Sequence, residues 1–324
     1  MKSFALKLTF TLAIALIIIW KTDVSAALAR FTMLSPLAIV VCLLLALLQL
    51  GLLSYRWMLV GRLTALQVPF AELLRCTLAS QFFSQGLPAS VGGDALRIWW
   101  LARRGIPAGT ATQNVLLDRL SGFLALLALN LASLPLLVAL LANATLTAIV
   151  AGTVIVTLAA VILCASRAGR RMSIAAFGLA RRVTGKERWG SGLLRWILVL
   201  QRAAGKLFRL PHGATVLAWG LLIHLLTVTF AVMIAGGAGI ALGFPAALAV
   251  VPGVLLLSYL PLSIGGWGVR EGGMALGLGL VGIPVSDAVF IGFALGGVGL
   301  LAALLGALVW LVSPMPVSAT GERR

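Results

Sequence analysis

The sequence predicts an all-α, polytopic membrane protein with about six full spans and two inverted re-entrant or broken helical hairpins. Of its 324 residues, 61% are hydrophobic and only 10% are charged, which is more apolar than a water-soluble domain of this length needs. Several apolar runs reach the roughly 20 residues that cross a bilayer as a helix. These runs are continuous rather than alternating, which argues against a transmembrane β-barrel. A third observation, an eleven-residue motif that occurs twice, predicts the two hairpins.

The spans follow from the apolar runs, taken in order along the chain. Six runs indicate them, at about residues 4–20, 33–55, 108–139, 146–165, 215–235 and 286–312. Residues 1–29 also imitate a cleaved signal peptide. Lys21 and Asp23 interrupt the expected cleavage region, so we expect a retained first span instead.

The repeated motif lies in the segments between these spans. Residues 87–97 read LPASVGGDALR and residues 260–270 read LPLSIGGWGVR, at an offset of 173 residues. Each copy is followed by Gly-Ile-Pro, at 105–107 and at 282–284. Proline removes a backbone donor and glycine permits unusual turns, so each copy predicts a broken helix. In membrane proteins a duplicated break indicates two inverted repeats that meet at a shared binding site.

These features predict a single integral membrane domain, 1–324, with inverted-topology units at 33–140 and 215–313. A basic connector, 167–212, joins the units and holds eleven of the 25 Lys and Arg residues. Positive charge collects in cytoplasmic loops, so we expect the connector and both termini in the cytoplasm of a bacterium, with the chain in its inner membrane. The connector could be an amphipathic helix on anionic lipid, or a linker that only sets the orientation.

The two breaks contain residues suited to an anionic ligand. Freed N–H groups at the start of a half-helix bind anions, and a serine there can cap the helix. A guanidinium one turn later suits phosphate. A purely structural alternative is that the glycines allow close helix packing and the arginines reach the membrane interface. The predicted binding residues of the breaks are Ser90, Gly92, Gly93, Asp94, Arg97, Ser263, Gly265, Gly266, Arg270 and Glu271.

Asp118 and Arg119 complete the predicted site. They lie roughly ten residues into a span, on the order of 15 Å along the helix. Charges this deep in a bilayer are costly and usually functional, although such a pair could merely lock two helices together. We expect no metal and no cofactor, because neither His212 nor His224 neighbours an acidic residue and the three cysteines lack metal-ligand spacing.

The motif residues resemble those of the lysylphosphatidylglycerol synthase transmembrane-region family, the flippase-like membrane domain also found in multiple peptide resistance factor. The resemblance implies a domain that moves lipids across the bilayer. Members that transfer aminoacyl groups carry a large soluble catalytic domain, and the sequence ends at Arg324 without one, so synthase activity is not expected. The matching residues are Leu87-Pro88, Gly92-Gly93-Asp94, Arg97, Asp118-Arg119, Leu260-Pro261 and 265–272.

The sequence therefore predicts a lipid flippase or translocase that binds an anionic lipid headgroup. The excess of Lys and Arg over the eight acidic residues does not predict nucleic-acid binding, because it is concentrated between apolar spans. Two alternatives stay open. One is a non-transporting membrane partner of a lipid- or glycan-modifying enzyme, and the other is an integral-membrane transferase that uses Asp94 or Glu271.

Overall fold

A computed structural model of the chain describes residues 30–312, apart from 31, 65, 87–90, 142–143, 185–193, 195–196, 199–200, 203, 206, 209–210, 260–262 and 264. Within this described part the secondary structure is helical throughout, as the sequence predicts. The expected first span at 4–20 and the polar C-terminal tail lie outside the described residues.

Ten described helices follow one another along the chain. The first group is α3 (Pro36–Leu63), α4 (Phe70–Gly86), α5 (Val91–Arg103) and α6 (Ala108–Leu141). Two peripheral helices follow, α7 (Ala144–Ala165) and α8 (Arg167–Thr184). The second group is α10 (His212–Gly237), α11 (Phe244–Tyr259), α12 (Val269–Gly279) and α13 (Val285–Val312).

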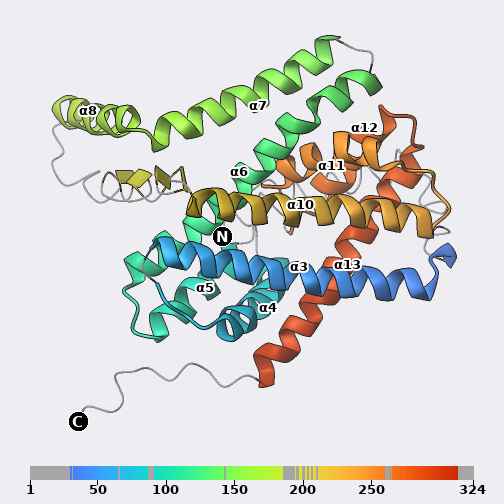
Figure 1. Ribbon diagram of the computed structural model, residues 1–324, viewed down its shortest axis with the longest axis horizontal. Helices are drawn as coiled ribbons and strands as arrows, with labels where there is room; N and C mark the ends of the chain where they lie inside the picture. Colours follow the sequence, from blue (N-terminus) through green and yellow to red (C-terminus); the bar gives the residue numbers. More distant parts are fainter. Residues whose placement is uncertain are drawn as a thin grey trace.

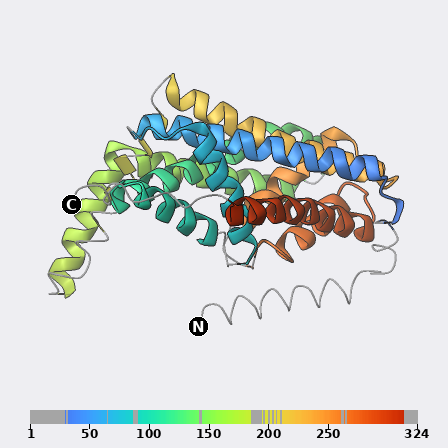
Figure 2. The same ribbon diagram turned by 90° about the horizontal axis from the view of Figure 1, so that it is seen from below.

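The two groups run in opposite directions through the molecule (Figure 1). Helices α3 and α10 pack side by side and antiparallel, and the view from below shows the same arrangement (Figure 2). The pair α4–α5 lies where α3 ends and α6 begins, whereas the pair α11–α12 lies at the other end, where α10 ends and α13 begins. Each pair packs against itself as a short hairpin.

The Gly-Ile-Pro echo forms the same corner in both groups. Gly105 and Gly282 take φ values of 81° and 87°, a left-handed conformation that favours glycine at a helix end. The next residue closes a Schellman-type bond: Ile106 N–H donates to the Leu101 carbonyl at 3.3 Å, and Ile283 N–H donates to the Leu278 carbonyl at 3.0 Å. The repeat is thus visible in backbone hydrogen bonds and not only in sequence.

Four described helices are long and apolar enough to cross a membrane, namely α3, α6, α10 and α13. The bent pair α7–α8 would make a fifth, with a bend of 77° between its two parts. Helices α3, α6, α7, α10 and α13 lie where the sequence places its spans from the second onward, whereas α8 falls in the predicted basic connector. The short, apolar α11 and the helices α4, α5 and α12 fall in the two predicted break segments.

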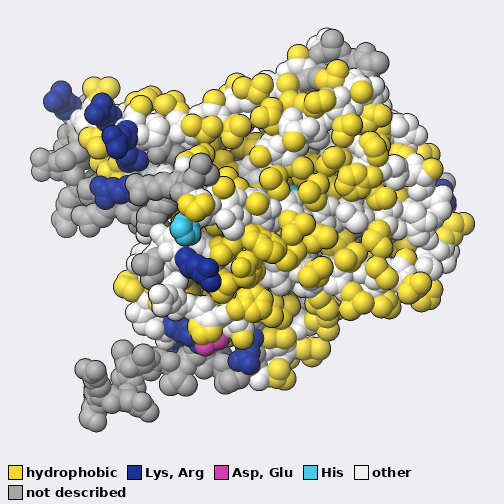
Figure 3. Space-filling view, in the orientation of Figure 1, with side chains coloured by type: hydrophobic (Ala, Val, Ile, Leu, Met, Phe, Trp, Pro, Cys, Tyr) yellow, Lys and Arg dark blue, Asp and Glu magenta, His cyan; other side chains and the backbone are white. Residues whose placement is uncertain are grey.

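The outer surface suits a bilayer. Hydrophobic side chains cover the face over α3 and α10, and basic side chains gather at the end that carries α8 (Figure 3). Inside, one cluster of buried apolar side chains includes Trp57, Trp100 and Leu101 of the first group. Another joins Phe290 and Met274 with other side chains of the second group.

Candidate functional site

A polar cavity of about 390 Å³ lies between the two helix groups. Its lining comes from α3, α4, α5 and α6 of the first group and from α10, α11, the turn before α12 and the start of α12 of the second. Nine predicted residues line it, namely Gly93, Asp94, Arg97, Asp118, Arg119, Ser263, Gly265, Gly266 and Arg270. Gly92 and Glu271 are buried beside it, and Ser90 lies outside the described residues.

Asp118 is the centre of the charged wall. Its Oδ1 accepts from Arg56 Nε at 3.0 Å, and its Oδ2 accepts from Arg97 Nη2 at 2.7 Å. The side chains of Asp118 and Arg56 are only 4% and 5% exposed. A buried charge is costly unless an opposite charge pairs with it. The carboxylate of Asp118 therefore needs the two guanidinium groups, and each guanidinium needs the carboxylate.

Arg56 is a site residue that the sequence analysis missed. In the sequence Arg56 directly follows the predicted second span, 33–55, where a basic residue is typical of the cytoplasmic end, but α3 continues to Leu63 and Arg56 is buried within the helix group. It therefore gives no support to the predicted orientation. Asp118 could have pointed to Arg56, because a carboxylate at membrane depth needs a basic partner on another helix.

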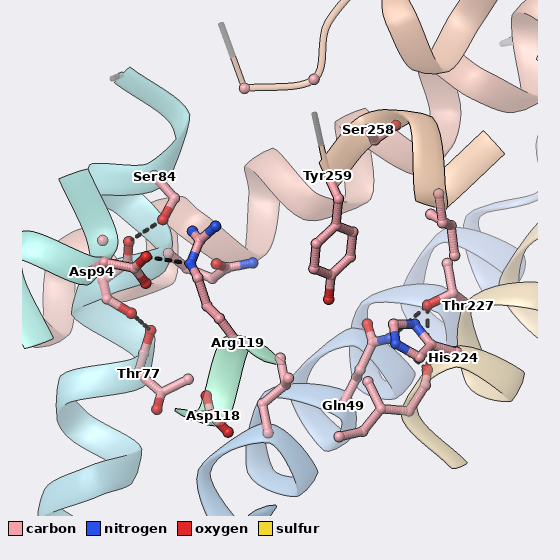
Figure 4. Close-up of a pocket in the computed structure, with 18 of the residues that line it drawn as sticks. Gln49, Thr77, Ser84, Asp94, Asp118, Arg119, His224, Thr227, Ser258 and Tyr259 are labelled. Atoms are coloured by element: carbon pink, nitrogen blue, oxygen red, sulfur yellow. Dashed lines mark hydrogen bonds and ion pairs between the residues drawn. The ribbon is translucent and has the colours of Figure 1, made fainter. Parts of the chain in front are cut away.

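Asp94 connects the first break to this network. One of its oxygens pairs with Arg119 Nε, and the other lies 3.9 Å from Arg97 Nη1. Figure 4 shows Asp94 and Arg119 facing each other beside Asp118, on the wall opposite Tyr259 and His224. The predicted pair Asp118-Arg119 is thus not mutually neutralising, since Asp118 pairs with arginines of α3 and α5 and Arg119 pairs with Asp94 of α5.

Arg270 forms a separate ion pair in the second group. Its Nη2 and Nε donate to Glu271 Oε1 at 2.6 and 3.1 Å, and Nε also donates to the Gly292 carbonyl at 2.9 Å. Glu271 is fully buried. Its other oxygen accepts from Gly268 N–H at 2.6 Å, which caps the first turn of α12. Glu271 therefore holds Arg270 in place and lies behind it, outside the cavity lining.

The two motif arginines have equivalent surroundings. The Arg97 guanidinium lies 3.8 Å from the ring centroid of Trp57, and that of Arg270 lies 4.8 Å from the ring of Trp267. Each also pairs with a buried carboxylate. Stacking on an aromatic face fixes the plane of a guanidinium, so both arginines present fixed N–H donors from opposite helix groups.

The two copies of the motif differ in backbone conformation, which corrects one expectation. Gly92 and Gly93 lie inside α5 rather than in a turn. Gly265 and Gly266 do form a turn, with φ values of 60° and 78°. Ser263 was expected to cap a helix, but the N-cap of α12 is Gly268 and Ser263 is a buried lining residue.

Gly93 has a packing role, in line with the structural alternative. A Cβ built there would lie 2.7 Å from the Ser80 carbonyl oxygen and would also collide with Ser84. The absence of a side chain therefore lets α5 pack against α4. A Cβ built on Gly265 would lie 3.5 Å from the Gln85 carbonyl oxygen. The turn before α12 therefore lies against the end of α4. The second motif segment thus reaches the end of α4, and residues of both motif copies line the cavity.

The wall facing the ion network is polar but carries no acid among its described residues. It is formed by Gln49 of α3, His224 and Thr227 of α10, and Ser258 and Tyr259 of α11 (Figure 4). Gln49 Nε2 donates to Thr227 Oγ1 at 2.7 Å, and His224 Nε2 bonds the Gly122 carbonyl at 2.9 Å. In the sequence these residues are only isolated polar positions within apolar runs, so sequence reasoning could not find them.

Arg30 also has a structural explanation. In the sequence it lies between the first two predicted spans, on the side of the membrane opposite the predicted cytoplasmic connector. In the structure its Nε and Nη2 donate to the two Asp287 oxygens at 2.8 and 3.1 Å, and Nη1 donates to the Ala238 carbonyl at 3.2 Å. These bonds join the chain before α3 to the C-terminal end of α10 and to the first turn of α13. They lie at the end of the molecule far from α8 (Figure 1).

The described residues contain no group of three or more His, Cys, Asp or Glu side chains placed to hold a metal ion. The protein-family model of the lysylphosphatidylglycerol synthase transmembrane region matches residues 4–307 of the chain. A comparison with curated proteins finds no significant match.

Proposed function

Because the chain belongs to the lysylphosphatidylglycerol synthase transmembrane-region family, we propose that it is a lipid translocase. The proposed ligand is an anionic lipid headgroup, bound in the cavity between the two broken helix pairs. The observation that carries the proposal is that Arg97 and Arg270, the equivalent arginines of the repeated motif, line the same cavity.

The charge of the site favours an anion. Four arginines belong to it, Arg56, Arg97, Arg119 and Arg270, together with three acids, Asp94, Asp118 and Glu271. With all of them ionised, the net charge is 4 − 3 = +1. One uncompensated positive charge in a largely buried site is unfavourable without a counter-ion. A phosphate diester supplies one negative charge and oxygen acceptors for guanidinium donors.

The motif arginines have donors available for such a ligand. The described residues provide Arg97 with one hydrogen bond, to Asp118, and leave its Nε without a partner. Arg270 uses Nε and Nη2 for its bonds to described residues. The remaining N–H groups are held in place by the tryptophan faces, so a headgroup would find donors that are already ordered.

The opposed directions of the two helix groups suggest how the site could face both leaflets. We propose that α4–α5 and α11–α12 enter the bilayer from opposite sides, as the halves of an inverted repeat do. Rocking of one group against the other would then open the cavity to one leaflet at a time. In this arrangement the basic end that carries α8 faces the cytoplasm of a bacterial inner membrane.

The test is headgroup translocation in proteoliposomes that contain fluorescently labelled phosphatidylglycerol. We expect Arg97→Ala and Arg270→Ala to reduce the rate to that of protein-free vesicles. Arg103→Ala is the matched control, because Arg103 is exposed on the same helix as Arg97 and lies outside the cavity. Wild-type rates from both site variants, with correct folding shown by thermal unfolding, would reject the assignment.

A further inference from the structure

An apolar groove on the outer side of the molecule has no role in the proposed function. It lies between α6, α7 and the connector, where Leu120, Val161 and Ala204 line it, and we call it the outer groove. We propose that the outer groove binds one acyl chain of an anionic phospholipid, whose headgroup lies against the arginines of α8. This second lipid site does not depend on the translocase assignment.

The size and lining of the outer groove suit a hydrocarbon chain. Its volume of about 310 Å³ lies at the small end of the range of about 300–1,000 Å³ for ligand pockets, so it fits part of a phospholipid. The Thr157 hydroxyl lines it but already donates to the Thr153 carbonyl at 2.7 Å. The rim is open, since Ala160 and Cys164 are exposed. Because α7 lies at a predicted span, this rim faces lipid rather than water.

The outer groove is separate from the polar cavity. No described residue lines both. Helix α6 stands between them, since Arg119 lines the cavity and the next residue, Leu120, lines the groove. Successive side chains of a helix point about 100° apart. A chain in the groove therefore lies on a different side of α6 from Arg119.

One buried polar group in the lining lacks a partner. Gln201 is 7% exposed, and its Nε2 donates to Ser173 Oγ of α8 at 3.0 Å. Its Oε1 has no hydrogen-bond partner among the described residues. A buried acceptor without a donor is unfavourable, and an O–H or N–H of a lipid headgroup would satisfy it. This acceptor does not choose between headgroups, but it places the polar part of the lipid beside α8.

The arginines of α8 supply the charge for the headgroup. The helix begins just after the groove rim, where Ser166 Oγ accepts from Gly169 N–H at 3.1 Å. Arg167 and Arg171 are exposed and four residues apart, so they lie on one side of α8, near its positive N-terminal end. Neither α8 nor the segment 194–208 contains an acid. Charge complementarity therefore favours an anionic headgroup over a zwitterionic one.

The remaining surface of α8 suits the membrane interface. Met172 and Leu179 are 59% and 63% exposed and, being seven residues apart, lie on one side of the helix. The axis of α8 bends by 77° from that of α7, so α8 crosses the end of α7 instead of continuing it (Figure 1). An apolar side next to an arginine side is typical of a helix at a lipid interface. A headgroup at α8 and a chain in the groove thus agree in depth.

The test uses Cys164 as a natural reporter at the groove rim. Cys42 and Cys76 are buried, so N-ethylmaleimide should modify Cys164 first in the purified full chain. We expect phosphatidylglycerol to slow this modification at a concentration at least about tenfold lower than phosphatidylethanolamine with the same chains, because nearby arginines favour net negative charge. Phosphatidylethanolamine also offers an N–H to Gln201, so the comparison isolates net charge. Glycerophosphoglycerol and inorganic phosphate, which have no acyl chain, should not protect Cys164.

A pair of double variants tests the headgroup part of the site. Arg167→Gln with Arg171→Gln should abolish the preference for phosphatidylglycerol in the Cys164 assay. The control is Arg62→Gln with Arg75→Gln, which removes two exposed arginines of α3 and α4 and should keep the preference.

A pair of tryptophan variants tests the groove. Ala160→Trp should fill it, so that native mass spectrometry finds one fewer phosphatidylglycerol on the chain than on the wild type. Ala159→Trp is the control, because Ala159 is exposed on the same helix outside the groove, and it should retain the full number. Thermal unfolding checks that both variants are folded.

Equal protection of Cys164 by the two lipids, or protection by glycerophosphoglycerol or phosphate, would overturn the inference. An unchanged number of bound lipids in Ala160→Trp would do the same. Protection that disappears in Arg97→Ala would assign the lipid to the polar cavity and would also overturn a second site. Protection that persists in Arg97→Ala, with the preference for phosphatidylglycerol intact, is the expected result.

Discussion

Asp118→Ala is the substitution that tests the buried ion network most severely. It removes both acceptors from Arg56 and Arg97, whose side chains are 5% and 12% exposed. Breaking a buried pair by removing one partner costs about 3–5 kcal/mol, because the remaining charge is left unpaired. A change of about 1 kcal/mol shifts the melting temperature of a protein of this size by about 2 °C. We therefore expect the melting temperature to fall by about 6–10 °C.

The assay is thermal unfolding of the purified protein in one detergent, with Asp287→Ala as the control. Asp287 pairs with one arginine, Arg30, rather than two, and the Arg30 side chain is 30% exposed, so this variant should lose about 1 kcal/mol at most. Asp118→Ala should also slow lipid translocation, whereas Asp287→Ala should not. Equal melting temperatures for the two variants would refute the buried network.

Two further predictions concern glycines of the repeated motif. Gly93→Ala places a Cβ 2.7 Å from the Ser80 carbonyl oxygen and should lower the free energy of unfolding by about 1–3 kcal/mol through overpacking. The control Gly109→Ala adds a Cβ that meets nothing within 4 Å and should not destabilise the protein. Equal thermal unfolding of the two variants would contradict the α4–α5 packing. Gly265→Ala forces alanine to a φ of 60° and should lose about 1–2 kcal/mol, together with translocation activity, because the turn lines the cavity. Gly236→Ala in α10, with open space around it, should be neutral or stabilising, so a similar loss from both variants would remove the turn from the explanation.

The repeated motif made a large part of the fold predictable. Two copies of one sequence at matching positions imply two similar local structures, and the corners at Gly105 and Gly282 have the same backbone bonds. The arginine of each copy could also be assigned to the site, because a guanidinium inside an apolar segment needs a buried partner or a ligand.

The conformation of each break could not be predicted from the shared letters. The dipeptide Gly-Gly is helical at Gly92-Gly93 and forms a turn at Gly265-Gly266. The residues that follow differ, since the second copy adds Gly268, which also takes a positive φ of 84°. Packing against Ser80 and Ser84 further favours the helix in the first copy, and such tertiary contacts have no local signature.

Arg56 shows the same limit for the site. In the sequence it stands at the end of an apolar run, where a cytoplasmic anchor is the simplest interpretation. Its burial depends on Asp118, which is 62 residues away on another helix. The neutral wall likewise forms only when Gln49, His224 and Tyr259 are brought together from three helices. A single sequence does not report these pairings.

The central claim is that the guanidinium groups of two opposed, broken helix pairs bind one lipid headgroup. Its most direct measurement is an electron cryomicroscopy map of the protein in nanodiscs that contain phosphatidylglycerol. We predict phosphate density in the cavity within hydrogen-bonding distance of both Arg97 and Arg270. Lipid density confined to the outer surface, with the two arginines in separate compartments, would contradict the claim.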